Sequence, residues 1–467
     1  MLSSEPTTKF SGLLRQLGLV SATSLVVSNM VGAGIFGTTG FMASALGDAK
    51  LILAAWFVGA LFALAGAVSY SELGINFPSS GGEYVYLTRA YGPAWGFMTG
   101  WVSFFAGFSA PIATAALIFA NYVGYFFPEQ FDPKTALIVG SGAFSLKLGA
   151  AQLLASSLIA AFTILNCFGV ARVARIQNAL TGFKILVIAA LVFFGFTMGQ
   201  GSWSNFSAPA ARDSTNSLPV EFMIQLLWVM VGYSGWNAAT YVAEELKQPE
   251  RTLPAALAIG TALVTVLYVG LNMVFIYSTP IQALKGVVAV GKVSAGNLFG
   301  PTGAALFSGL MAISIMPTVN AMVTIGPRVY YAMAKNGAFV RAAAVVHPRW
   351  HTPVFAILSQ GACAILMTLT PIPDLFLFIG FSLTLFTVLA VASVFVFRRR
   401  PNWQKLRAVD FLYPLIPTAY ILVGTGMVVW GIIFQPTVSL TALGTIAVGA
   451  AVYHFTRKGK GAAVEIG

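Results

Sequence analysis

Apolar residues occur in long continuous runs along almost the whole chain, separated by short polar segments. A run of about 20 mostly apolar residues can cross a lipid bilayer as an α-helix. The strands of a membrane β-barrel would instead alternate between apolar and polar residues. The pattern therefore predicts twelve spanning helices, at residues 19–46, 50–74, 93–126, 148–170, 176–198, 219–243, 254–278, 301–335, 352–372, 374–397, 411–433 and 437–457.

Composition supports this assignment to the membrane. Of the 467 residues, 57% are hydrophobic and only 9% are charged. Soluble domains carry about 25% charged residues, so this chain lacks the polar side chains needed to cover a water-facing surface. We expect an all-α integral membrane protein in which residues 1–467 form a single transmembrane domain.

The excess of basic residues, a formal net charge of +12, indicates topology rather than nucleic-acid binding. Cytoplasmic loops of membrane proteins are enriched in Lys and Arg. With the N-terminus inside, 19 of the 26 basic residues fall in inner segments, 6 in outer segments, and one, Lys184, inside the fifth run. We therefore expect both termini in the cytoplasm and no nucleic-acid partner. The short termini favour a prokaryotic protein of the cytoplasmic (inner) membrane.

Two apolar runs are interrupted near their midpoints by glycine. Residues 31–37 read VGAGIFG and residues 231–237 read VGYSGWN, and each stretch opens a block of five helices. Interruptions at matching positions of two halves point to a transporter built from inverted repeats. Close helix packing through small residues is the alternative explanation.

An unwound turn in a membrane helix leaves backbone N–H and C=O groups that hydrocarbon cannot satisfy. The N–H groups that begin the second half-helix suit a carboxylate, because that end also carries the positive pole of the helix dipole. The carbonyl groups before the break suit an ammonium group. Since a zwitterionic amino acid presents both charges, the two breaks favour an amino acid as substrate.

Short motifs between residues 17 and 345 resemble those of the amino acid–polyamine–organocation (APC) superfamily, and most resemble its L-type amino acid transporter branch. They are 32–36 (GAGIF), 70–74 (YSELG), 80–84 (SGGEY), 165–167 (LNC), 235–237 (GWN), 244–249 (EELKQP), 319–320 (VN) and 328–331 (RVYY). Each motif alone is weakly specific, whereas their order along the chain is strongly specific.

The resemblance implies a LeuT-like fold with five-plus-five inverted repeats. Residues 19–198 and 219–397 would form the two repeats, and residues 411–457 would form two additional helices. The substrate would lie at the membrane midplane between broken helices 1 and 6, and helices 3, 8 and 10 would also line its site.

The resemblance assigns substrate binding to residues that flank the two breaks. They are Met30, Val31, Gly32, Ala33, Gly34, Ile35, Val231, Gly232, Tyr233, Ser234, Trp236 and Asn237. The N–H groups around residues 32–34 would hold the carboxylate. Carbonyl groups near Met30, Val231 and Ser234 would hold the amino group.

Three of these residues are candidates for shaping or gating the pocket, namely Tyr233, Trp236 and Asn237. Helix packing is the alternative role for Trp236, as for any buried aromatic side chain. Family members usually have Ser at the position of Ala33, so one side-chain hydrogen bond is lost here and backbone contacts must suffice.

Neither broken stretch contains Asp or Glu. A cationic substrate side chain in so dry a site would need a counter-charge or several carbonyl groups. The sequence therefore favours a secondary active transporter of neutral L-amino acids, working by alternating access as a sodium-independent exchanger or a proton-coupled symporter. A transporter of cationic amino acids or polyamines with the same fold is the alternative.

A channel and an intramembrane enzyme are weaker alternatives. An enzyme would need a catalytic pair or metal ligands at membrane depth, and the sequence offers no such set. We expect no enzymatic activity, no metal and no cofactor.

Lys184 lies inside an apolar helix, where a charged side chain is costly and commonly functional. In sodium-independent relatives, the resemblance places a lysine here in the space that sodium fills elsewhere. Its ammonium group would contact helix 1 carbonyls near Ser28 and Val31. On helix 8 it would contact Ser314 or Thr318. The alternative is a side chain whose charged end reaches the membrane surface.

Animal members of the L-type branch pair with a glycoprotein through a cysteine between helices 3 and 4. Residues 127–147 contain no cysteine, and both cysteines, Cys167 and Cys363, lie in apolar runs. We expect no disulfide-linked heavy subunit. The protein would be a monomer or a non-covalent dimer in contact with membrane lipid and its amino acid substrate.

Acidic and basic residues crowd the inner end of the sixth helix. They lie near Arg89 or Arg172 in the predicted topology and could form ion pairs that close the inner side; the cluster comprises Glu244, Glu245, Lys247, Glu250 and Arg251. A solvated loop without a special role is the alternative, because exposed ion pairs contribute little.

Overall fold

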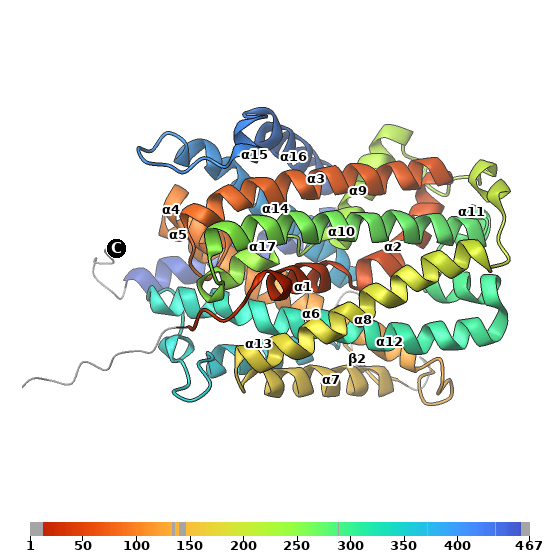
Figure 1. Cartoon of the computed structure of the whole chain (residues 1–467), viewed down its shortest axis with the longest axis horizontal. Helices are drawn as coiled ribbons and strands as arrows, with labels where there is room; N and C mark the ends of the chain where they lie inside the picture. The colour runs from red at the N-terminus through yellow and green to blue at the C-terminus, as the bar shows by residue number, and fades with distance from the viewer. Residues whose placement is uncertain are drawn as a thin grey trace, which may run out of the picture.

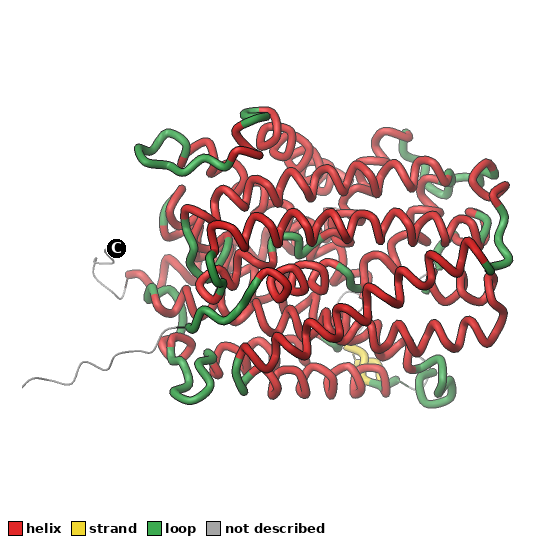
Figure 2. Tube along the Cα trace, viewed as in Figure 1, coloured by secondary structure: helices red, strands yellow, loops and turns green. Residues whose placement is uncertain are grey.

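Helices lying side by side along one axis make up most of the protein (Figures 1 and 2). The computed structural model describes residues 13–132, 136–139, 146–287, 289–370, 372–434 and 436–458. Two short helices mark opposite ends of the bundle, α4 (Glu83–Tyr91) and α11 (Ile281–Leu284), and we name the ends after them (Figure 1).

Nine helical segments in the described residues are long and apolar enough to cross a membrane. They are Leu19–Leu46, Ala49–Asn76, Pro93–Val123, Val173–Thr197, Leu218–Glu245, Pro249–Ser278, Val290–Lys335, Phe378–Phe397 and Leu415–Phe434. Three shorter apolar helices accompany them, Ala150–Asn166, Val354–Met367 and Ser439–Phe455. Each run predicted from the sequence overlaps one of these segments, so the all-helical membrane class is confirmed.

The individual elements subdivide these segments. The longer α-helices are α1 (Leu19–Met30), α2 (Ala33–Leu46), α3 (Ala49–Asn76), α5 (Pro93–Val102), α6 (Ala110–Val123), α7 (Ala150–Asn166), α8 (Val170–Thr197), α9 (Leu218–Tyr233), α10 (Pro249–Ser278), α12 (Val290–Lys335), α13 (Val354–Met367), α14 (Ile372–Phe397), α16 (Leu415–Phe434) and α17 (Pro436–Lys458). Shorter elements are the helices α15 (Arg407–Asp410), η1 (Ser103–Ser109), η4 (Trp203–Ser207), η5 (Ala238–Glu245) and η6 (Arg341–Ala344), and the antiparallel strands β1 (Leu137–Val139) and β2 (Leu146–Leu148).

The first segment is broken within the stretch predicted from its glycines. α1 ends at Met30 and α2 begins at Ala33. Between them, Val31 (φ −76°, ψ 90°) and Gly32 (φ −139°, ψ −145°) leave the helical region. The N-cap residue of α2 is Gly32, so no side chain caps the first N–H groups of this half-helix.

The sixth segment is broken by a turn at residues 234–237. Gly235 has φ +95°, a conformation that glycine adopts without steric cost. The chain then continues as the 3-10 helix η5 rather than the α-helix predicted to residue 243. This tighter helix brings the segment to the α4 end of the bundle.

Several features of the fold were not predicted from the hydrophobic pattern. The third segment contains a π-helix, η1, and α4 forms a nine-residue helix between two spanning segments. α12 begins at Val290 rather than near residue 301, because a second helix joins it across a kink at Gly300 (φ +74°). The β1–β2 hairpin falls in a segment predicted only as a loop.

The two broken segments occupy the middle of the bundle. α1 packs against α8, α10 and α12, while α2 packs against α9. α9 in turn contacts α3, α14 and α16. Both breaks are therefore enclosed by other helices.

Candidate functional site

A cavity of about 50 Å³ lies beside the second break. Its walls are formed by Asn29, Phe62, Gly107, Phe108, Pro111, Met230, Val231, Ser234, Gly235, Trp236, Asn237, Tyr241, Met322, Gly380, Leu383, Thr384, Thr387 and Tyr420. None of these described lining residues is Asp, Glu, Lys, Arg or His. The cavity therefore offers apolar surface and uncharged hydrogen-bonding groups. Its volume is smaller than the roughly 300–1,000 Å³ of most ligand pockets.

Four of the residues predicted for substrate binding line this cavity, namely Val231, Ser234, Trp236 and Asn237. The others lie at the two breaks and are absent from the described lining: Met30, Val31, Gly32, Gly34, Ile35, Gly232 and Tyr233. The side chain of Ala33 lies outside the described residues. The second break thus faces the cavity more directly than the first.

Gly34 and Gly232 bring the two broken segments into backbone contact. A Cβ atom at Gly34 would lie 2.4 Å from the Cα atom of Gly232. A Cβ atom at Gly232 would lie 2.7 Å from the ring of Trp56. These two glycines therefore serve the close packing that was the alternative explanation for the glycine clusters.

Tyr233 packs in an aromatic cluster behind the cavity wall. Its ring centroid lies 5.6 Å from that of Trp56 and 5.1 Å from that of Tyr268. Trp236 lies in the wall and makes an edge-to-face contact with Tyr70, with ring centroids 4.7 Å apart. Of the two aromatic residues predicted to shape the pocket, Trp236 alone is among the described lining residues.

Two of the three carbonyl groups predicted to hold an amino group, those of Met30 and Val231, already accept hydrogen bonds within the protein. The Tyr268 hydroxyl lies 2.6 Å from Met30 O and 2.8 Å from Gly232 O, so its one proton is shared between the two carbonyl oxygens. The Ser234 hydroxyl donates to Val231 O at 2.8 Å. Val231 O also accepts from the Ser234 backbone N–H (3.2 Å), so both of its lone pairs are in use, whereas Met30 O can accept one further hydrogen bond.

Lys184 is almost completely buried, at 1% exposure, and lies against the first break. Its ammonium group donates to Val31 O (2.5 Å) and to the Thr318 hydroxyl (2.7 Å), and Ser28 O lies 3.4 Å away. Thr318 itself donates to Val31 O at 2.7 Å. The lysine thus connects α8 to α1 and α12, and its charged end does not reach the membrane surface.

Of the two alternatives predicted on the eighth helix, Ser314 or Thr318, the ammonium group contacts Thr318. The Ser314 hydroxyl donates to Leu310 O within α12.

A chain of buried hydrogen bonds leads from α1 toward the α4 end. The hydroxyl groups of Ser28 and Thr181 lie 2.6 Å apart. Gln177 donates to the Thr181 hydroxyl (3.2 Å) and accepts from the Asn320 amide (2.6 Å). Asn320 belongs to the 319–320 motif, whose side chain thereby joins α8 to α12.

The chain continues from Asn320 to an ion pair at the α4 end. The Asn166 amide donates to Asn320 Oδ1 (2.9 Å), and Thr324 donates to Asn166 Oδ1 (2.7 Å). Arg328 then donates to the Thr324 carbonyl oxygen and to Glu245 Oε1, the latter at 2.8 Å. The buried partner of Glu245 is therefore Arg328 on α12, while the side chain of Arg172 lies outside the described residues.

Glu83 lies at the start of α4 and is only 5% exposed. The Tyr70 hydroxyl (3.0 Å) and the Asn237 amide both donate to its Oε1 atom. Among the described residues, no Lys or Arg forms an ion pair with it. Burial raises the pKa of this carboxyl group, while hydrogen bonds from Tyr241, Tyr70 and Asn237 act in the opposite direction. Since Asn237 and Tyr241 line the cavity, their side chains separate Glu83 from it.

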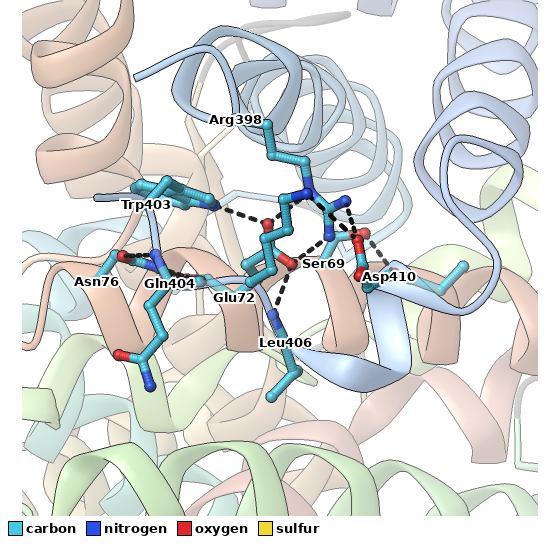
Figure 3. Close-up of polar contacts among 10 residues, drawn as sticks. Ser69, Glu72, Asn76, Arg398, Trp403, Gln404, Leu406 and Asp410 are labelled. Carbon is cyan, nitrogen blue, oxygen red and sulfur yellow. Dashed lines mark hydrogen bonds and ion pairs between the residues drawn. The ribbon is translucent and has the colours of Figure 1, made fainter. Parts of the chain in front are cut away.

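A second cluster ties α3 to the loop that follows α14 (Figure 3). Both carboxylate oxygens of Glu72 accept from Arg398, at 2.8 and 2.6 Å. The Trp403 indole and the Leu406 backbone N–H also donate to Glu72. Arg398 reaches Asp410 at 2.9 Å. The carboxylate of Glu72 is fully buried and fully paired, unlike that of Glu83.

The cavity is also lined by residues that were not predicted from the sequence. Asn29 is 6% exposed and its side-chain oxygen has no hydrogen-bond partner among the described residues. Phe108 follows a glycine within the π-helix, and Thr384 and Tyr420 come from α14 and α16. Asn29 could have been predicted from the sequence, because it places an amide in an apolar helix two residues before a predicted break, where the amide needs a hydrogen-bond partner.

An all-helical membrane protein with an uncharged cavity beside two broken helices has the architecture of a small-molecule transporter. A sequence model of the amino acid permease family matches residues 17–453, and the chain belongs to that family. The superfamily predicted from the sequence motifs is therefore confirmed.

Individual relatives align along nearly the whole chain. The chain is 30% identical to the serine/threonine exchanger SteT of Bacillus subtilis (strain 168) over 462 residues, which cover 97% of this chain and 99% of SteT. It is 29% identical over 449 residues to the large neutral amino acids transporter small subunit 2 of Homo sapiens, covering 94% of this chain and 80% of that protein. It is 27% identical over 454 residues to the Asc-type amino acid transporter 1 of Homo sapiens, covering 94% and 82%.

Proposed function

We propose that this protein is a secondary active transporter that carries neutral L-amino acids by alternating access. The observation that carries the proposal is the uncharged cavity beside two broken helices in a member of the amino acid permease family. A cationic amino acid or polyamine would meet no carboxylate among the described lining residues. The names of SteT and of the neutral amino acid transporters also support a neutral substrate.

The substrate would bind with its charged groups at the first break and its side chain in the cavity. The uncapped N–H groups that begin α2 suit its carboxylate. Its ammonium group would take the free lone pair of Met30 O and the unpartnered oxygen of Asn29, and would displace the Ser234 hydroxyl from Val231 O. For this to happen, the contact between Gly34 and Gly232 must open.

Lys184 would act as a fixed cation at the position that a sodium ion fills in sodium-coupled relatives. Its contacts with Val31 O and Thr318 support this role, because both are oxygen atoms that a cation could coordinate. The coupling would then be sodium-independent exchange or proton-coupled symport.

The proposed topology places twelve spans in the membrane, with residues 19–198 and 219–397 as inverted repeats and residues 411–457 as two added helices. The three short apolar helices would complete the nine long segments. The α4 end would face the cytoplasm and the α11 end the outside of a cytoplasmic membrane. The protein would be a monomer or a non-covalent dimer without a disulfide-linked subunit.

Transport by purified protein in liposomes tests the function. Liposomes preloaded with unlabelled L-serine, L-threonine or L-leucine should take up the same labelled amino acid. Replacing sodium with choline should leave the rate unchanged. L-Arginine and putrescine serve as cationic probes, and faster uptake of either than of every neutral amino acid would overturn the proposed specificity. A non-saturable ion current would indicate a channel instead.

A further inference from the structure

A second cavity lies at the α11 end, beyond the first break. Its volume is about 230 Å³, against about 50 Å³ for the central cavity. It is lined by Phe36, Gly37, Ile118, Asn121, Tyr122, Tyr125, Ala289, Lys292 and Ser308. Phe36 follows the start of α2 by about 5 Å along the helix axis. This cavity therefore adjoins the half-helix whose first N–H groups are proposed to hold the substrate carboxylate.

Lys292 supplies positive charge to this cavity. Its ammonium group lies 4.5 Å from the centroid of the Tyr125 ring, a cation–π contact that holds the side chain at the wall. The described lining residues include no Asp or Glu. Among the described residues, Lys292 also has no ion pair. A half-buried ammonium group without a carboxylate partner favours a bound anion.

Tyr122 adds an unpartnered hydroxyl group to the same wall. The residue is 5% exposed, and its buried hydroxyl has no hydrogen-bond partner among the described residues. Buried polar groups in folded proteins nearly always have a partner, and a group without one points to a ligand or a water molecule. A carboxylate oxygen could accept from both Tyr122 and Lys292.

Ser308 supplies a hydrogen-bond acceptor to the same cavity. This residue is fully buried, and its hydroxyl donates to Ala304 O at 2.8 Å. Its proton is therefore in use, and its lone pairs remain to accept from an ammonium group. Phe36 and Ile118 provide the apolar part of the wall. Together these groups match a zwitterion with a neutral side chain.

We propose that this cavity is a second binding site for the transported amino acid, in which Lys292 and Tyr122 bind its carboxylate and Ser308 accepts from its ammonium group. The proposal rests on the transport function proposed above. With the α11 end outside, an amino acid occupies this site before it reaches the central cavity.

Uptake by intact bacterial cells that express the full chain tests the site, because all copies then share one orientation. The probes are labelled L-serine and L-leucine at increasing external concentrations. The external KM should rise about three- to tenfold in Lys292→Met, as for the loss of one charged hydrogen bond. The maximal rate per expressed molecule should not change. Lys292→Arg, which keeps the charge, should stay near the wild-type KM.

Lys50→Met is the matched control, because Lys50 is exposed at the start of α3 on the same end and does not line the cavity. The KM of Lys50→Met should equal that of the wild type. If its KM rises as much as that of Lys292→Met, the effect of Lys292 comes from the general surface charge, and the second site is overturned. Where Lys292→Met lowers expression, Tyr122→Phe removes only the unpartnered hydroxyl and should raise the KM in the same direction.

The remaining outcomes separate the two proposals. An unchanged KM in both Lys292→Met and Tyr122→Phe, with normal wild-type uptake, overturns the second site alone. If wild-type cells take up no amino acid, the transport function fails and the second site fails with it. Replacing external chloride with gluconate should leave the wild-type KM unchanged. A chloride effect that disappears in Lys292→Met would assign the cavity to an inorganic anion and overturn the proposal.

Discussion

Arg328 of α12 and Glu245 of η5 form an ion pair whose side chains are only 1% and 0% exposed, with Nε and Oε1 2.8 Å apart. The two residues lie 83 positions apart in the sequence. The pair ends the hydrogen-bonded chain that begins at Ser28 beside the first break. It therefore connects the central region to the α4 end of the bundle.

Removing one member of this pair should be strongly destabilising. Arg328→Met leaves the Glu245 carboxylate buried without a partner, which costs about 3–5 kcal/mol. The double variant Arg328→Met with Glu245→Leu should recover most of this loss, because no buried charge remains. Thermal unfolding of the purified protein in detergent measures both effects. Lys335→Met is the control, since its ion pair with Glu244 is long (3.9 Å) and exposed and should contribute at most about 1 kcal/mol. A single variant as stable as the wild type would contradict the paired assignment.

Replacing Lys184 with Ala should abolish transport. The substitution removes the cation that Val31 O and the Thr318 hydroxyl share and leaves these groups facing an empty space. Exchange of labelled amino acid in proteoliposomes measures the loss, which should exceed about 100-fold if the lysine organises the first break. Ser314→Ala is the control, because its hydroxyl donates only within α12. Unchanged transport with an unchanged pH profile in Lys184→Ala would exclude a coupling role.

Glu83 should make the opening of the α4 end depend on pH. Burial raises the pKa of this carboxyl group above its ordinary value of 4.5. The closed arrangement, with Glu83 buried, therefore binds a proton more readily than an open arrangement in which Glu83 is hydrated. Lowering the pH from the raised pKa toward 4.5 stabilises the closed arrangement, and this stabilisation is lost as the pH rises through the raised pKa.

Transport by wild-type protein should consequently slow as the pH falls through that window. Glu83→Gln, which keeps the hydrogen-bonding shape without the titration, should give a flat profile. The measurement is the exchange rate at a series of pH values, equal on both sides of the liposome membrane. Glu250→Gln is the matched control, since Glu250 is exposed in the first turn of α10 and its replacement should retain the wild-type dependence. Identical profiles for Glu83→Gln and the wild type would assign the pH dependence elsewhere.

Gly34→Ala should destabilise the protein and slow transport. The new methyl group would lie 2.4 Å from the Cα atom of Gly232, so α2 and α9 must separate. Such overpacking costs about 1–3 kcal/mol. Gly182→Ala in α8 is the control, because a Cβ atom there meets no atom within 4 Å. The melting temperatures of the two variants should differ clearly, with Gly182→Ala at or above the wild type.

The features that could be predicted from the sequence are those that the membrane imposes locally. Apolar length places the helices, and glycine clusters place both breaks to within a few residues. Lys184 stands out because a lone cation in hydrocarbon requires partners nearby. The hydrophobic pattern did not reveal η1 or α4, because a π-helix has the same apolar composition as an α-helix and α4 is not a spanning segment.

The partners of each polar residue depend on tertiary packing that one sequence does not specify. Glu245 could have paired with any nearby basic residue, and only the position of α12 selects Arg328. The cavity wall likewise draws Thr384 and Tyr420 from helices that carry no functional motif. Gly34 could be assigned either to ligand binding or to packing, and only the distance to Gly232 shows the packing contact.

The ammonium group of Lys184 has one consequence for energetics. A cation that is covalently attached to the protein stays in place through every transport cycle and is not released on either side of the membrane. It contributes no work from an ion gradient unless the amine releases and regains a proton. A protein that relies on such a built-in charge would run in the direction set by the amino acid pools on its two sides. It would equalise the ratios of those pools and leave net accumulation to other transporters.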